Sequence, residues 1–206
     1  MTFISRRDLL KAAAIVPFAR GFQSGARPPI ENLTATEMQL LDSIVARLIP
    51  TDANGPGATE ALAAHYIDHA LGNALASSRQ AYTAGLAALD RYARSSRGAP
   101  FTQLSPTDQD SVLIDVETGA ATGFTGSSAA FFAMVLNHTH QGTFGDPYYG
   151  GNAKFVGWDL IGYPGVRTMV TATDQKSLES KVLKPNHKSA YEYEFTKAAG
   201  DHHHGD

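Results

Sequence analysis

The sequence predicts an all-α fold, an irregular bundle of about five to six helices with a long glycine- and aromatic-rich loop near the C-terminus. Three observations support this. Apolar residues recur at helical spacing in several segments of the 206-residue chain. Helix-capping residues precede these segments, and clusters of turn-forming residues separate them. We therefore divide the chain into a leader over 1–26, a single helical domain over 27–184 and a flexible tail over 185–206.

The first helix is predicted over residues 35–48. Thr34 and Glu37 form a capping-box pattern, in which each side chain bonds to the backbone of the other residue. Pro50 ends the run of apolar residues that follows. Those residues recur at helical spacing: Met38, Leu41, Ile44, Val45 and Leu48. One face of this helix should therefore be buried.

Three further helices are predicted in the first half of the chain. Thr59 can cap an alanine-rich helix that ends near Gly72, and residues 78–95 carry an apolar stripe at helical spacing. Ser105, followed by a proline at the first helical position, favours a helix that runs to about Glu117.

A fifth helix is predicted over residues 127–138. It is apolar on nearly every side, which places it at the centre of the bundle. Residues 141–168 then hold seven glycines and two prolines among aromatic residues. A loop of this length without regular structure is commonly a functional or binding element. A short helix is predicted to follow over residues 174–183.

The composition excludes several function classes. The chain has no cysteine, so thiol nucleophiles, iron–sulfur clusters and c-type haem attachment are excluded. No segment reaches the ~18–20 uninterrupted apolar residues of a membrane-spanning helix. With 17 basic and 20 acidic residues, the chain also lacks the charge of a nucleic-acid-binding protein.

The N-terminus has the outline of a twin-arginine export signal. Arg6 and Arg7 stand in a basic region, the apolar run 12–19 follows, and small residues continue to Ala26. The alternative is a surface helix that begins with a basic turn. As an export signal, this leader would place the protein in the periplasm through the twin-arginine pathway.

The common catalytic and cofactor motifs are missing from the sequence. It contains no Gly-x-Ser-x-Gly nucleophile elbow and no phosphate-binding Gly-x-x-x-x-Gly-Lys-Ser/Thr loop. No predicted strand leads into a Gly-x-Gly-x-x-Gly turn of the kind that binds a dinucleotide. We therefore expect neither catalytic residues nor a cofactor in this chain.

Two histidine pairs could bind a metal, although we expect no metal site. His65 and His69 stand four residues apart on one helical face, whereas His138 and His140 are two apart. The alternatives are half-exposed helix residues for the first pair, and a buried ring or a subunit contact for the second. A solvated tail is the default interpretation of the histidines at 202–204.

The long loop resembles a known family. The pattern His138-x-His140-Gln141-Gly142-x-Phe144-x-Asp146-Pro147-x-Tyr149-Gly150-Gly151-Asn152, followed by Gly157-Trp158-x-Leu160-Ile161-Gly162-x-Pro164-Gly165, is similar to the signature of the gluconate 2-dehydrogenase subunit 3 family. Ile49-Pro50-Thr51-Asp52 and the leader also match that family. The resemblance covers about residues 33–167.

This resemblance implies a non-catalytic small subunit of a periplasmic dehydrogenase complex. In such complexes a large flavoprotein of the glucose–methanol–choline oxidoreductase type holds FAD and oxidises a sugar, glycoside or sugar acid. A cytochrome c subunit, which carries haem, often takes the electrons onward. The small subunit binds the flavoprotein, supports its folding and supplies its export signal.

We predict that the loop 142–165 docks on this partner. Tyrosine and tryptophan are enriched in the cores of protein interfaces, so Tyr149 and Trp158 are the expected anchors. Asp146 and Asn152 are expected to hold the loop's own turns. The predicted partner-binding residues are Phe144, Asp146, Tyr149, Gly150, Gly151, Asn152 and Trp158. The alternative for the aromatic residues is that the loop folds back on its own helices.

Two other functions stay open at this point. One is a metal-dependent hydrolase that uses the four histidines of the two pairs. The other is a free-standing periplasmic protein whose loop closes over a small ligand. An obligate subunit differs from both because it should be unstable without its partner.

Overall fold

The computed structural model describes residues 27–167, 169–180 and 182–191, and over these ranges the chain is all-α, as predicted. The predicted leader lies outside these ranges, as do residues 192–206 of the predicted tail. The α-helices of the described residues are α2 (Ala35–Leu48), α3 (Ala63–Ala70), α4 (Arg79–Arg97), α5 (Pro106–Glu117), α6 (Ser128–Phe144), α7 (Val156–Ile161) and α8 (Ala172–Glu179). Four short 3₁₀ helices connect them: η1 (Ala76–Ser78), η2 (Phe101–Gln103), η3 (Pro147–Tyr149) and η4 (Ala153–Phe155).

Helices α2 and α5 begin where their capping residues predict. The prediction for α3 was wrong, because this helix begins at Ala63 with Leu62 at its N-cap and has no cap from Thr59. The Thr34 hydroxyl accepts a hydrogen bond from the Glu37 amide at 3.2 Å, and the Glu37 carboxylate accepts one from the Thr34 amide at 2.8 Å. This capping box starts α2 at the predicted residue. The hydroxyl of Ser105 caps α5 in the same way, through the amide of Asp108.

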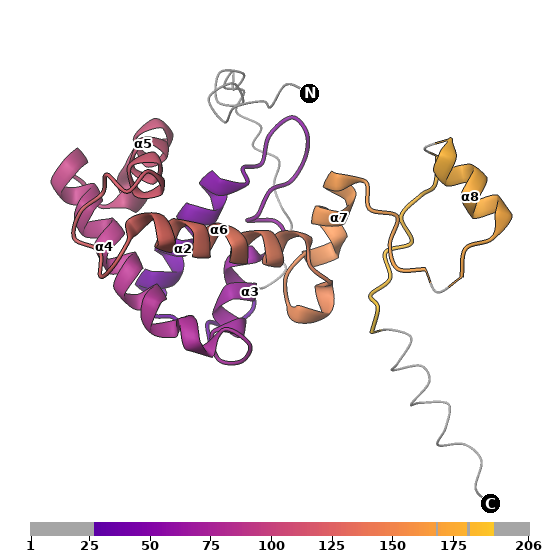
Figure 1. Cartoon of the computed structure of the whole chain (residues 1–206), viewed down its shortest axis with the longest axis horizontal. Coiled ribbons are helices and arrows are strands. Elements are labelled where there is room, and N and C mark those ends of the chain that lie inside the picture. Colours follow the sequence, from indigo (N-terminus) through magenta and orange to yellow (C-terminus); the bar gives the residue numbers. More distant parts are fainter. Residues whose placement is uncertain (1–26, 168, 181, 192–206) are drawn as a thin grey trace, which may run out of the picture.

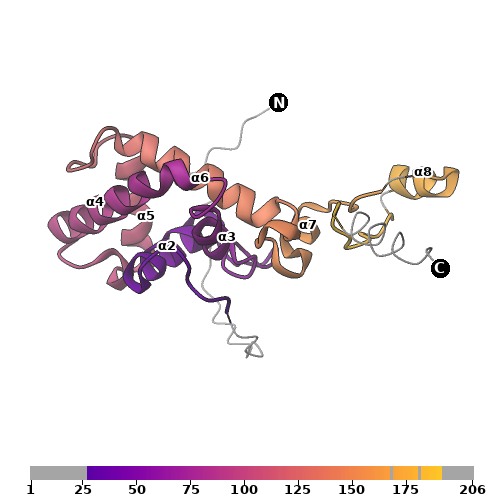
Figure 2. The same ribbon diagram turned by 90° about the horizontal axis from the view of Figure 1, so that it is seen from below.

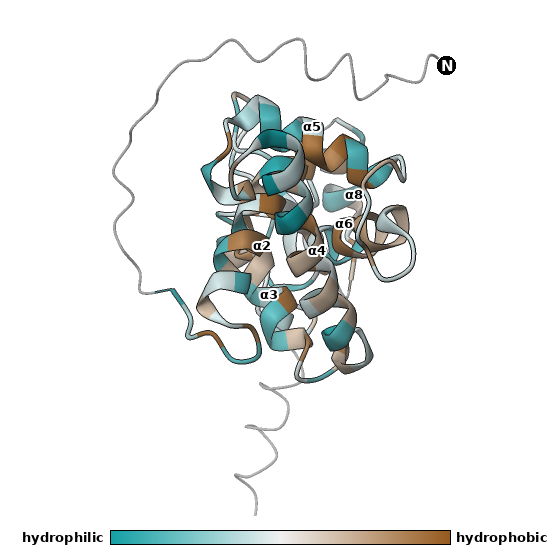
Figure 3. Cartoon of the chain, turned by 90° about the vertical axis from the view of Figure 1, so that its left-hand side faces the viewer, coloured by the Kyte–Doolittle hydropathy of each residue, from teal (hydrophilic) through white to brown (hydrophobic). Residues whose placement is uncertain are grey.

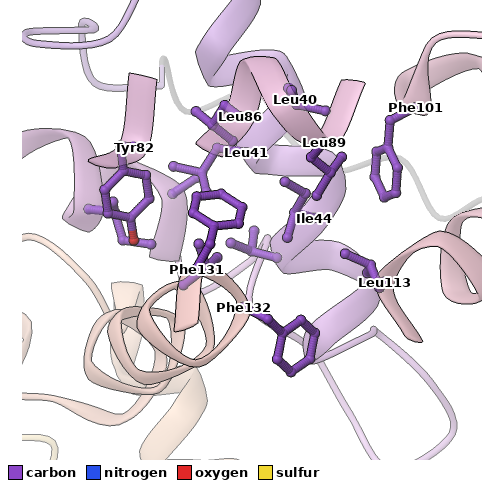
Figure 4. Close-up of a cluster of buried hydrophobic side chains, with 14 of the residues drawn as sticks. Leu40, Leu41, Ile44, Tyr82, Leu86, Leu89, Phe101, Leu113, Phe131 and Phe132 are labelled. Atoms are coloured by element: carbon purple, nitrogen blue, oxygen red, sulfur yellow. The ribbon is translucent and has the colours of Figure 1, made fainter. Parts of the chain in front are cut away.

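The hydrophobic core lies between α2, α3, α4, α5 and α6. Helix α6 packs against the other four and also against α7, which confirms its predicted central position. Figure 4 shows Leu41 and Ile44 of α2, Leu86 of α4 and Phe131 of α6 directed toward one another. Gly85 has no side chain, so the Phe131 ring can lie directly against the backbone of α4. The helices of this body carry hydrophilic and hydrophobic residues on the same ribbon, as amphipathic helices do (Figure 3).

The predicted long loop is more regular than expected. Helix α6 continues past the predicted end to Phe144, and η3, η4 and α7 occupy much of the rest. The last turns of α6 are polar, so hydrophobic periodicity did not reveal them. One face of these turns is nevertheless buried, and the hydroxyls of Thr139 and Thr143 on that face each donate to a carbonyl four residues earlier, at 2.8 and 2.7 Å.

Helix α8 stands apart from the helical body, at the end of an extension that follows α7 (Figures 1 and 2). It begins two residues before the predicted start and ends at Glu179, four residues early. A capping box between Thr171 and Asp174 fixes its first turn. No described residue of α8 is buried. Among the described ranges, no helix is long and apolar enough to cross a membrane.

Candidate functional site

Three tyrosines form an exposed surface at the end of α6, which we term the aromatic ledge: Tyr148, Tyr149 and Tyr191. The rings of Tyr148 and Tyr191 are stacked with centroids 4.2 Å apart, and Tyr149 meets Tyr148 edge-on at 5.3 Å. The hydroxyls of Tyr149 and Tyr191 share a hydrogen bond, which raises the pKa of Tyr191. Tyr148 and Tyr149 are nevertheless 52% and 49% exposed. The ledge is therefore held by its own contacts while Tyr148 and Tyr149 stay about half exposed.

Asp146 holds the ledge together from below. Its carboxylate accepts a hydrogen bond from the amide of Tyr148 at 2.9 Å, which caps η3 as predicted. It also accepts bonds from the hydroxyl of Ser189 at 2.7 Å and the amide of Ala190 at 2.8 Å. One carboxylate therefore ties η3 to a segment more than forty residues later in the chain.

Asn152 organises the turn behind the ledge. Its side-chain amide donates to the carbonyl of Gly145 at 2.9 Å, and its side-chain oxygen accepts from the amide of Gly157 at 2.8 Å. Its own backbone amide donates to the carbonyl of Gly142 at 2.6 Å. The residue is completely buried and has a positive φ of 44°, which asparagine tolerates better than most residues. The predicted turn-holding roles of Asp146 and Asn152 are confirmed.

Trp158 packs inside the chain. Its indole is 5% exposed and lies against the rings of Phe155 and Tyr163, with centroids 5.3 and 4.8 Å away. The indole N–H donates to the carbonyl of Phe144 at 2.8 Å. These contacts correspond to the alternative that the sequence left open for Trp158, in which the loop folds back on its own helices.

The predicted partner-binding residues therefore differ in exposure. Tyr149 and Gly150 are exposed, and Phe144 and Asp146 are half-buried. Gly151, Asn152 and Trp158 are buried. Sequence reasoning missed Tyr191, because it placed that residue in the flexible tail. A signal was present, since the aromatic residues of Tyr191-Glu192-Tyr193-Glu194-Phe195 are unusual for a solvated tail.

A hollow of about 170 Å³ adjoins the ledge. It lies between residues 28–31, α3 and η3. Its lining residues are Pro28, Pro29, Glu31, His65, His69, Tyr148, Tyr149 and Gly150. The first histidine pair thus stands next to the ledge. Sequence spacing alone did not suggest that these two features are neighbours.

The two histidines of this hollow have different environments. His69 is exposed, and its Nδ1 atom lies 3.0 Å from the Glu31 carboxylate. His65 is buried, and neither of its ring nitrogens has a hydrogen-bond partner among the described residues. Burial lowers the pKa of His65, which favours the neutral ring.

The two members of the second histidine pair differ in burial, because His138 is packed inside the helical body and His140 is exposed. His138 stacks on Tyr82, and its Nδ1 atom lies 3.0 Å from the Tyr82 hydroxyl. Burial lowers the pKa of His138. His140 contacts the ring of Phe144. Within the part of the chain that the structure describes, no three histidine, aspartate or glutamate residues are grouped so that they could hold a metal ion.

Comparison with known proteins gives a match to one family model. Neither the curated proteins nor the solved structures compared with this chain gave a match. The sequence model of the gluconate 2-dehydrogenase subunit 3 family, in contrast, matches residues 35–165, which include α2 to α7 and two tyrosines of the aromatic ledge. The match covers more than half of the chain, and the chain therefore belongs to the gluconate 2-dehydrogenase subunit 3 family.

Proposed function

We propose that this protein is the non-catalytic small subunit of a periplasmic, flavin-dependent dehydrogenase complex that oxidises a sugar, glycoside or sugar acid. Its family membership carries the proposal, because the family is named as a subunit of a dehydrogenase. In this role the chain binds and stabilises the large flavoprotein subunit. Its leader directs both proteins to the twin-arginine pathway.

The distribution of exposed apolar residues supports a binding role. Ten large apolar residues are exposed in the described ranges, and all but Ile30 and Ile114 lie between residues 148 and 182. The ledge contributes two of them and is held by the hydrogen bonds of Asp146. A surface that is ordered before binding loses less conformational entropy on association, so the ledge suits a docking role.

The flavin is assigned to the large subunit. The sequence of this chain has no strand followed by a glycine-rich turn that would hold the pyrophosphate of FAD. It also has no cysteine for covalent haem attachment, so haem would belong to a cytochrome c subunit of the complex. The substrate would be selected by the active site of the flavoprotein.

Replacing Tyr149 with alanine tests the docking role. The change removes an aromatic ring at the centre of the proposed interface, where truncation of an anchor commonly costs about 2 kcal/mol or more. We expect about a thirtyfold weaker affinity for the flavoprotein. The affinity can be measured by titrating the small subunit against the isolated large subunit, and far-UV circular dichroism should show unchanged helix content.

Ile114→Ala is the matched control for Tyr149→Ala. Ile114 is 44% exposed on α5 and lies outside the ledge. Its truncation removes a similarly exposed apolar side chain and should leave the affinity unchanged. Equal affinities for wild type, Tyr149→Ala and Ile114→Ala would show that the flavoprotein binds elsewhere.

The export role is tested by Arg6→Lys combined with Arg7→Lys. The twin-arginine pathway recognises the arginine pair, so both the small subunit and the flavoprotein should remain in the cytoplasm. Dehydrogenase activity in the periplasmic fraction measures the outcome. Arg20→Lys makes the same chemical change outside the pair and should not alter export. Undiminished periplasmic activity in the double variant would contradict the proposal.

A further inference from the structure

The described residues of 167–184, which exclude 168 and 181, form a projecting segment with a closed base, which we term the finger. Hydrogen bonds close this base: the Arg167 guanidinium donates to the carbonyl of Lys184 at 3.0 Å, and the Asn186 side chain donates to the carbonyl of Val166 at 2.6 Å. The amide of Asn186 also donates to Pro164 at 3.2 Å. Helix α8 lies in the projecting part, away from the helical body (Figures 1 and 2).

The finger exposes apolar and basic side chains together. Four of its apolar residues are more than half exposed: Met169 at 77%, Val170 at 61%, Leu178 at 53% and Val182 at 66%. Lys176 and Lys184 are also exposed. Apolar side chains flanked by lysines are typical of elements that bind at a membrane surface, where the former enter the headgroup region and the latter meet lipid phosphates.

The charge of the finger region is opposite to that of the helical body. Residues 163–191 carry five basic and two acidic side chains, a net charge of +3. Residues 27–162 carry seven basic and thirteen acidic side chains, a net charge of −6. The four acidic residues and one basic residue of 192–206 follow in the chain after the base of the finger. The finger itself, residues 167–184, carries four basic and two acidic side chains, so positive charge exceeds negative charge in the segment that projects.

We propose that the finger binds the surface of an anionic phospholipid bilayer. The negative surface attracts the lysines, and each basic residue near such a surface strengthens binding by about fivefold. Because the finger projects, the acidic body stays farther from the lipid, where its repulsion is screened over a Debye length of about 8 Å at physiological salt. The finger lies beyond residue 165, where the family match ends, so this property is proposed for this chain and does not depend on its role as a subunit.

Vesicle binding tests the proposal directly. The purified full chain should sediment with vesicles made of equal parts phosphatidylglycerol and phosphatidylcholine, and much less with phosphatidylcholine alone. Combining Lys176→Gln with Lys184→Gln should weaken binding to the anionic vesicles about thirtyfold. Leu178→Ser should weaken it about tenfold, because a partly inserted leucine is lost. Higher salt should reduce the binding of the wild type.

Two control variants make these changes outside the finger. Lys154→Gln neutralises an exposed lysine of η4, and Ile114→Ser alters an exposed apolar residue of α5. Both should bind like the wild type. Unchanged binding in the double lysine variant would overturn the proposal, since the vesicles would then be held by another part of the chain. Loss of flavoprotein binding in that variant, with vesicle binding intact, would likewise overturn it and assign the finger to a protein contact.

Discussion

Trp158→Ala is expected to lower the free energy of unfolding by about 3–5 kcal/mol, the usual cost of removing a buried tryptophan side chain. The indole contacts Phe155 and Tyr163, and its N–H bonds to the end of α6 at 2.8 Å. Truncation would leave a cavity and a carbonyl at Phe144 without this partner. Because α7 is only six residues long, it depends on such contacts for its position.

The loss can be measured by denaturant unfolding followed by far-UV circular dichroism, since Trp158 is the chain's single tryptophan and fluorescence would be lost with it. Trp158→Phe keeps most of the apolar contact and removes the N–H donor, so its cost should be smaller. Tyr149→Ala truncates an aromatic residue that is 49% exposed, and it should cost less than Trp158→Ala. If Trp158→Ala unfolds like the wild type but no longer binds the flavoprotein, the indole acts as a docking anchor after all.

The fold was predictable where local signals determine it. Capping residues at Thr34 and Ser105 set the starts of two helices, and apolar spacing predicted a buried face for the helices at 35–48 and 78–95. The end of α6 escaped prediction for a physical reason. Its buried face carries His138, Thr139, Gly142 and Thr143, and the two threonines satisfy their hydroxyls within the helix itself. Such a face contributes no hydrophobic periodicity.

The turns of the candidate site could be predicted from the sequence, whereas the exposure of its aromatic side chains was harder to predict. Asn152 bonds to residues close in sequence, and so does Asp146 where it caps η3. Their residue types and the neighbouring glycines and proline were therefore informative. The bonds that Asp146 accepts from Ser189 and Ala190 span more than forty residues and gave no local signal. The burial of Trp158 and the stacking of Tyr191 on Tyr148 depend on how distant segments meet, and the latter pair is separated by 43 positions. Hydrophobic aromatic residues suit an interface and a core equally well, so composition could not distinguish these outcomes.

A contact that the sequence did not suggest connects residues 31–33 to α3. Asp68 is 1% exposed, and its carboxylate accepts three backbone hydrogen bonds, from the amides of Glu31 at 2.7 Å, Asn32 at 2.9 Å and Leu33 at 2.6 Å. Nothing in residues 31–33 indicates that they bond to an aspartate in the last turn of α3. These bonds fix the segment that brings Pro28, Pro29 and Glu31 to the hollow beside the ledge.

Asp68→Ala is therefore expected to lower the free energy of unfolding by about 3–5 kcal/mol, because three amides lose an ionised acceptor at once. Asp68→Asn keeps an acceptor oxygen but turns an N–H₂ group toward the same donors, so its cost should lie between alanine and wild type. Thermal unfolding measures both losses. A glutamyl endopeptidase should also cleave after Glu31 faster in the variants, since the segment is released from α3.

Asp42→Asn provides the matched control. Asp42 pairs with Arg27 at 2.9 Å, but the arginine side chain is 57% exposed, and such surface pairs contribute about 0–1 kcal/mol. Its loss should alter neither stability nor cleavage appreciably. If Asp68→Ala and Asp42→Asn have equal and small effects, the segment 31–33 is held mainly by Leu33, which is 6% exposed, and the carboxylate does not anchor it. A large loss confined to Asp68 would instead show that its buried carboxylate positions residues 28–33 beside the aromatic ledge.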